Sequence, residues 1–126
     1  LPPAGPPPGY ATYLGASLAD TPTEVASDGA GHACLTGQTF SANFPVQASA
    51  FDNSYGGGGD AFVTVLNTAA AGAASLTYST YLGGTASDLG TGIALDEAGT
   101  LHVTGRTFSL NFPTTTNAGL MSSSTK

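Results

Sequence analysis

Hydrophobic and polar residues alternate in short runs along the chain, and glycine-rich or polar turns separate the runs. This alternation predicts strands at residues 23–28, 33–39, 61–67, 76–82, 91–96 and 101–107. A short turn joins each run to the next in the first and last pairs, which predicts antiparallel hairpins. The middle pair is joined by TAAAGAASL, which is too short for a stable helix and is expected to be a hairpin loop. The chain is therefore predicted to be all-β.

Two of the expected strands also indicate how they pack. The run AFVTVLN is apolar on both faces, which predicts that both sides of that strand are covered. In TGIALD, the large Ile93 and Leu95 alternate with the small Gly92 and Ala94. Such small residues are expected where one face approaches a neighbour closely near a crowded axis, which suits an inner strand.

A long internal repeat organises these runs. Residues 10–45 and 78–113 align without a gap at a spacing of 68 residues, with 19 identities in 36 positions, among them TYLG, TG-x-TFS and NFP. A period of this length that contains several short strands indicates a multi-stranded unit in tandem. We predict antiparallel four-stranded propeller-like blades, with one complete blade at about residues 23–82 flanked by partial blades.

The repeat divides the chain into segments with unpaired ends. The expected segments are a Pro-rich extended arm (1–9), an outer strand and connection (10–22), the complete blade (23–82), a partial second repeat (83–116) and a Ser/Thr-rich tail (117–126). The outer strand is expected at YATYLG. Open strand edges invite pairing, so we expect them to be completed by other repeats. The first residue is not methionine, which fits a processed end or a fragment.

Composition excludes several classes of partner. Charged residues make up 8% of the chain, the net charge is -6, and Arg106 and Lys126 are the only strong cations. No basic patch exists to neutralise phosphates, so nucleic acid is not expected as a partner. No apolar run approaches the roughly 18 residues needed to span a bilayer, so membrane insertion is not expected either. Few cations and many small polar residues favour a secreted or surface-exposed bacterial protein. Cys34 is the single cysteine and cannot close a disulfide within the chain.

A few acidic residues could bind a metal. Asp28 and Asp96 precede A-G turns, where a carboxylate could ligate calcium with turn carbonyls. An aspartate at such a turn more commonly accepts hydrogen bonds from nearby backbone amides, and we favour that interpretation. Asp20, Asp60 and Asp88 stand at glycine-rich strand entries, and they would form a metal site only if they converged across blades.

No catalytic or cofactor-binding residue is predicted. Cys34 and His102 occupy the same repeat position, with His32 nearby, but the clustered spacing of a soft-metal site is absent. A lone cysteine in a strand usually behaves as a small buried hydrophobe. The GGGGD run lacks the Lys-Ser/Thr of a phosphate-binding loop and leads into a strand, so it is expected to be a flexible turn.

Apolar and aromatic residues suggest contacts with a partner. Tyr10 and Tyr13 recur as Tyr78 and Tyr81, and such side chains could stack on sugar rings or on a subunit, although packing within an outer strand is favoured. The residues predicted at an interface are Tyr10, Tyr13, Leu14, Ile93, Leu101 and Val103.

The repeated phrases resemble a known family. YSTYLGG-x-x-x-D, G-I-A-x-D-x-x-G, V-T-G-x-T, NFPT and GGGGDAFVTVLN are similar to the bacterial β-propeller repeats called SBBP repeats. The resemblance spans most of residues 10–116 and implies a large secreted or surface protein. It does not imply an activity, because fold analogy does not deliver function.

We therefore expect a non-enzymatic, extracellular structural protein that assembles with copies of itself or with adjoining repeats. In this hypothesis, residues 10–15 of one subunit add to the blade begun by residues 91–107 of its neighbour, giving a ring or a filament. The alternative is a carbohydrate-binding or adhesion module that recognises surface polysaccharide.

Overall fold

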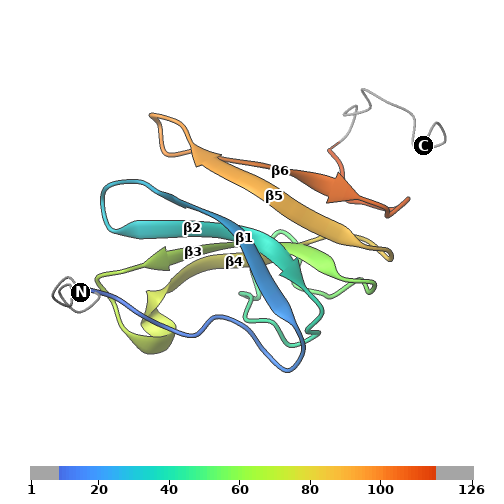
Figure 1. Cartoon of the computed structure of the whole chain (residues 1–126), viewed down its shortest axis with the longest axis horizontal. Helices are drawn as coiled ribbons and strands as arrows, with labels where there is room; N and C mark the ends of the chain where they lie inside the picture. The colour runs from blue at the N-terminus through green and yellow to red at the C-terminus, as the bar shows by residue number, and fades with distance from the viewer. Residues whose placement is uncertain (1–8, 116–126) are drawn as a thin grey trace, which may run out of the picture.

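Residues 9–115 form six strands and one short 3-10 turn (Figure 1). The computed structural model describes residues 9–115, so most of the predicted arm and all of the predicted tail lie outside the described residues. The elements are β1 (Asp20–Ser27), β2 (His32–Thr39), β3 (Asp60–Asn67), η1 (Gly72–Ser75), β4 (Leu76–Leu82), β5 (Asp88–Leu95) and β6 (Leu101–Thr107). No helix of these residues is long and apolar enough to cross a membrane.

The strands form two antiparallel sheets, which confirms the predicted fold class. One sheet has four strands in the order β1-β2-β3-β4, so each strand pairs with its neighbour in sequence. The other is the hairpin β5-β6, which lies over β1 and β2 in Figure 1. The first sheet is the complete blade predicted from the sequence, and the hairpin is the start of the next. The TAAAGAASL connection is a loop that contains η1, a single turn.

The first strand of each repeat begins three residues earlier than the alternation predicted. β1 begins at Asp20 and β5 at Asp88, whereas runs starting at residues 23 and 91 were expected. Pro22 obscured this start, because proline cannot donate to a strand ladder. It is tolerated in β1 because β1 is an edge strand and the register shifts between Pro22 and Glu24.

The two inner hairpins have the same register, as their ungapped identity predicts. Val25 pairs with Leu35 in the first copy, and Ile93 pairs with Val103 in the second. The bulge also recurs, since the register shifts between Gly90 and residue 92 as it does after Pro22. The 68-residue repeat is therefore a repeat of hydrogen-bonding pattern as well as of sequence.

The outer strand predicted at residues 10–15 is not present. Residues 10–19 have no strand assignment, and Tyr13 is 103% exposed. The matching run in the second copy is β4, which is a strand because β3 pairs along it. No strand of the described residues lies beside residues 10–15 to do the same. The segment nevertheless packs on the blade, where Leu14 is partly buried and the Tyr10 hydroxyl donates to Ser75 Oγ at 2.8 Å.

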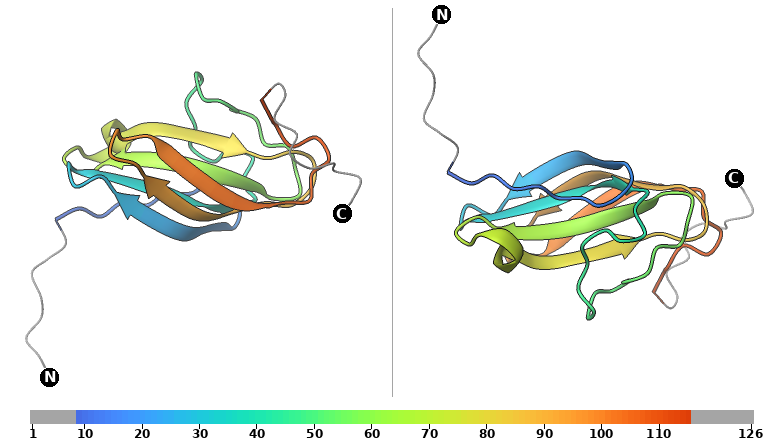
Figure 2. Two further views of the ribbon diagram at one scale, coloured as in Figure 1. Left: turned by 90° about the horizontal axis from the view of Figure 1, so that it is seen from above. Right: turned by 90° about the horizontal axis from the view of Figure 1, so that it is seen from below.

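Both faces of β3 are covered, as its apolar pattern predicted. On one face, Val63 belongs to a cluster that includes Ile93 of β5. On the other face, Phe62 and Tyr81 pack with Phe44, which comes from the loop of residues 40–59. A neighbouring blade therefore covers one face only, and the second cover comes from this blade's own loop (Figure 2).

Candidate functional site

The contact between the two sheets is one of two apolar clusters among the described residues. Cys34, Val63 and Ile93 form its buried centre, so β5 packs against β2 and β3. Partly buried apolar side chains surround this centre: Ala26, Val65, Leu82, Leu95, Leu101 and Val103. Three residues predicted at an interface, Ile93, Leu101 and Val103, thus pack against another blade within the same chain. Whether any of the six contacts a second chain stays a prediction.

Close approach of the two sheets depends on glycine in β5. A Cβ atom on Gly90 would lie 1.9 Å from Thr36 Oγ1, far inside van der Waals contact. The Gly90 carbonyl accepts a hydrogen bond from the Thr23 hydroxyl of the first blade. Small residues in TGIALD were expected at such a contact, and Gly90, just outside that run, meets the neighbour most closely.

The first copy has the same apolar positions, but Val25 is exposed and Leu35 packs against the blade's own aromatic cluster, which includes Phe44. Val25 corresponds to Ile93 in the repeat and is 59% exposed, whereas Ile93 is 8% exposed. Leu35 corresponds to Val103 and lines a shallow hollow with Val25. The face that packs against another blade in the second copy is therefore uncovered around Val25 in the first copy.

Aspartates at the strand entries fix the loops that precede them. Asp88 accepts hydrogen bonds from the Gly84 amide and the Ser109 hydroxyl, both at 2.8 Å. Asp20 does the same in the first copy, accepting from the Ala16 amide at 2.7 Å and the Ser41 hydroxyl at 3.3 Å. These contacts explain why the aspartate and the serine of TFS recur together, since the buried Asp88 and the partly buried Asp20 both need hydrogen-bond donors.

The asparagine of NFP completes the same arrangement. Asn111 Oδ1 accepts from the Thr85 amide at 3.0 Å, and Asn43 Oδ1 accepts from the Ser17 amide at 3.3 Å. Sequence reasoning did not assign a role to these asparagines. The recurrence of T-F-S-x-N-F-P indicated that these asparagines are important. Each asparagine contacts a loop more than twenty residues earlier in the sequence, and this contact forms only in the folded chain.

Asp60 and Asp88 are two fully buried carboxylates on neighbouring blades. A Cβ on Gly83 would be 2.8 Å from Asp60 Cγ and 2.8 Å from Asp88 Oδ2, so the two carboxyls flank this glycine. Asp60 accepts from the Gly56 amide at 2.9 Å, yet Oδ1 of each aspartate has no hydrogen-bond partner. Burial raises the pKa of Asp60 to about 6, and the nearby Asp88 charge adds to the effect.

The two calcium candidates lie in matching turns beside one polar hollow. Asp28 and Asp96 both line it, together with Glu97. Each carboxylate is engaged locally, since Asp28 Oδ1 accepts from the Ala30 amide at 2.7 Å and Asp96 Oδ1 from the Ala98 amide at 2.9 Å. The backbone hydrogen bonds are the main cause of the lowered pKa of Asp28, whereas the side-chain hydrogen bond to His102 is the main cause of the lowered pKa of Asp96. The geometry is that of the aspartate turn favoured from the sequence.

The described residues do not gather a metal-ligating cluster. Within residues 9–115, no group of three or more His, Cys, Asp or Glu side chains could hold an ion. Cys34 is buried among apolar side chains, and burial raises the pKa of its thiol. His32 and His102 each pair with the aspartate of their own turn, at 2.6 and 3.0 Å.

Tyr81 holds the loop of residues 40–59 against the blade. Its hydroxyl donates to the Ser41 carbonyl at 2.7 Å and accepts from the Phe44 amide at 3.1 Å. Its ring packs with Phe44 and with Tyr55. Tyr78 lies nearer the start of β4, where its hydroxyl accepts a hydrogen bond from the Phe51 amide at 3.3 Å. Tyr13, which matches Tyr81 in the repeat, makes no such contact and stands exposed.

The two hairpins share their register, their bulge and their aspartate contacts, so the chain contains one structural unit in two copies. Residues 77–113 match the family model described as SBBP, a β-propeller repeat. This segment is similar to SBBP β-propeller repeats. The matched SBBP residues run from β4 through β6 to the NFP motif, and residues 10–45 are their internal copy. Neither curated proteins nor solved structures give a match to the chain.

Proposed function

We propose that this chain is a non-enzymatic structural module that works by packing against further SBBP blades. The observation that supports the proposal is the difference between Ile93, buried against the first blade at 8% exposure, and its counterpart Val25, which is 59% exposed. Equivalent positions with equivalent pairing should be buried in equivalent ways when every blade has a neighbour. An apolar inner face left open costs about 25 cal/mol for each Å² that a neighbour would cover.

The partner of this face is a further blade, supplied by a copy of the chain or by an adjoining repeat. In a copy, the outer face of β5-β6 is free and presents Ala94 and His102, which are both exposed. That face would meet Val25 and Leu35 head to tail, and repetition of such a contact gives a ring or a filament. The low content of lysine and arginine supports an extracellular or cell-surface setting.

The test is the mass of the native chain in solution, measured by light scattering over a range of concentrations. We expect association, and we expect Val25→Asp to weaken it by placing a charge on the open face. Phe51→Asp is the matched control, because Phe51 is 63% exposed and does not line the hollow formed by Val25 and Leu35. A chain that stays monomeric at high concentration would exclude self-assembly and leave adjoining repeats as the partner.

The alternative function, recognition of surface polysaccharide, gains no specific support from the geometry. A sugar site needs an aromatic platform next to hydrogen-bonding groups. The polar hollow at Asp28 and Asp96 is lined by Ser27, Asp28, Leu95, Asp96, Glu97, Ala98 and Gly99, with no aromatic residue among them.

A further inference from the structure

The outer edge of β6 is unpaired among the described residues. β6 has one partner there, β5, in a two-stranded sheet. Its counterpart β2 has two, because β1 pairs along one edge and β3 along the other. The pairing of β2 with β3 runs from His32 opposite Asn67 to Thr39 opposite Asp60. An unpaired strand edge presents a row of free amides and carbonyls to any strand that fits it.

β6 has the same local geometry as β2. The β5-β6 register repeats that of β1-β2 pair by pair, including the bulge. The backbone groups that β2 turns toward β3 therefore have counterparts in β6 at the same spacing. A strand that pairs with β2 in a given register should pair with β6 in the same register.

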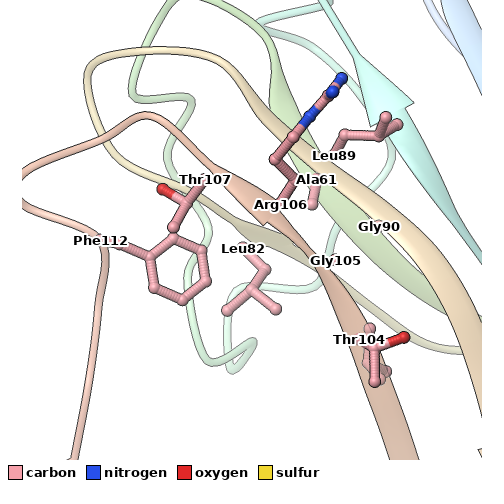
Figure 3. Close-up of a pocket in the computed structure, with 10 residues that line it drawn as sticks. Ala61, Leu82, Leu89, Gly90, Thr104, Gly105, Arg106, Thr107 and Phe112 are labelled. Atoms are coloured by element: carbon pink, nitrogen blue, oxygen red, sulfur yellow. The ribbon is translucent and has the colours of Figure 1, made fainter. Parts of the chain in front are cut away.

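An apolar groove runs beside this edge (Figure 3). It has a volume of about 250 Å³ and lies between the β6 hairpin and the first blade. Its main walls are Leu82, Leu89, Val103, Gly105 and Phe112. In Figure 3 the Phe112 ring and the Leu82 side chain lie beside each other at one end of the groove.

The first copy shows which side chain fills the equivalent space. There Phe62 of β3 pairs opposite Gly37, and a Cβ on Gly37 would lie 2.9 Å from the Phe62 ring. The Phe62 ring also packs on Phe44, with 4.7 Å between centroids. Gly105 and Phe112 are the counterparts of Gly37 and Phe44, and both line the groove. Within residues 9–115, no phenylalanine takes the corresponding position beside β6.

We propose that the edge of β6 accepts a strand of the β3 type, with an aromatic side chain placed opposite Gly105. This inference rests on the proposed function, because the donor is a further repeat unit, but it concerns a different surface from Val25 and Leu35. The donor strand has the pattern Asp-Ala-Phe-Val-Thr-Val. It comes from a unit other than a folded copy's own β3, which is already paired on both edges by β2 and β4.

A synthetic peptide with the sequence of residues 59–67, GDAFVTVLN, serves as the donor strand. It is titrated into the isotopically labelled full chain, and backbone amide signals and hydrogen exchange are followed by NMR. We expect shifts confined to β6 and the groove, and slower exchange of β6 amides by about tenfold. A peptide carrying Phe62→Ala should bind about tenfold more weakly or worse, since burial of a phenylalanine side chain drives the contact.

The chain offers a matched pair of variants for the groove. Phe112→Ala removes a wall and should weaken binding of the GDAFVTVLN peptide by about tenfold. Phe108→Ala is the control, because Phe108 lies just after β6, is 64% exposed and does not line the groove. Amide spectra of both variants without peptide establish that each one folds.

Three results would overturn the inference: no change at β6 with millimolar peptide, shifts at the edge of β1 or β4 instead, or equal binding of the peptide with Phe62→Ala. These results would not contradict the proposed function, because light scattering of Val25→Asp tests the apolar face at Val25 and Leu35, whereas the peptide tests the edge of β6. Conversely, a monomeric chain that binds the peptide at β6 would refute self-assembly and support the strand site.

Discussion

Neutralising Asp60 should remove a pH dependence that this one carboxyl imposes on stability. Asp60 is fully buried at the start of β3, with Oδ2 bonded to the Gly56 amide and Oδ1 without a partner. Burial is the main cause of its raised pKa of about 6, against 3.8 for the ordinary group, and the charges of Asp88 and Asp52 contribute. In Asp60→Asn the amide oxygen still accepts from Gly56, while the charge is gone.

The direction in which stability changes with pH depends on whether the folded or the unfolded state binds the Asp60 proton more tightly. The folded pKa lies above the unfolded one, so folding is favoured while Asp60 is protonated, and stability falls as pH rises from about 4 to about 6. With about 1.4 kcal/mol for each pKa unit, the loss is about 3 kcal/mol at most. Asp28 and Asp96 have lowered pKa values, so their effect has the opposite sign and falls at lower pH.

The assay is urea unfolding at several pH values between 4 and 8, followed by circular dichroism and tyrosine fluorescence. The unchanged chain should lose stability between pH 4 and 6, whereas Asp60→Asn should be nearly flat and more stable at pH 7. Asp96→Asn is the matched control, because that carboxylate is partly exposed and its loss should leave the pH 4 to 6 slope intact. An equal slope in Asp60→Asn and the unchanged chain would refute the reasoning.

Three further predictions concern other contacts. Ser109→Ala removes a donor from buried Asp88 and should cost about 1–3 kcal/mol in the same unfolding assay. Gly90→Ala places a Cβ against Thr36 Oγ1, so we expect amide exchange in β5 and β6 to accelerate as the hairpin separates from the blade, while exchange in β3 changes less. The buried Cys34 thiol should react with a thiol reagent only when the chain unfolds, and rapid labelling of the folded chain would contradict its placement.

The strands and the repeat could be predicted because their signals are local. Alternation over a few residues identified all six strands, and ungapped identity transferred the register of one hairpin to the other. The exception is the run at residues 10–15. Its sequence matches β4, but a strand also needs a partner, and here the pattern of side chains could not supply one.

The buried polar contacts could not be predicted because they join distant parts of the chain. Asp88 was noticed as a strand entry, but its donor Ser109 was not, and nothing local to Asn111 indicates that it bonds Thr85. The Asp60–Asp88 approach across Gly83 depends on the packing of two blades. In the sequence, these polar residues stand out only because they recur in both copies. Recurrence marks a position as important, but it does not show which residue that position contacts.

The topology also decides how residues 10–15 could join a neighbouring blade. They match β4, and β4 pairs with β3 but not with β2. Direct addition of this segment to β6, which matches β2, would therefore place it one strand too far inward. A β3-type strand must lie between them, with its phenylalanine in the groove at Gly105 and Phe112. With that strand in place, the exposed Tyr13 could take the role that Tyr81 has in the first blade, donating to the Ser109 carbonyl as Tyr81 donates to that of Ser41. From this strand order we predict that residues 10–15 can join the blade begun by β5 and β6 only after a β3-type strand has paired with β6.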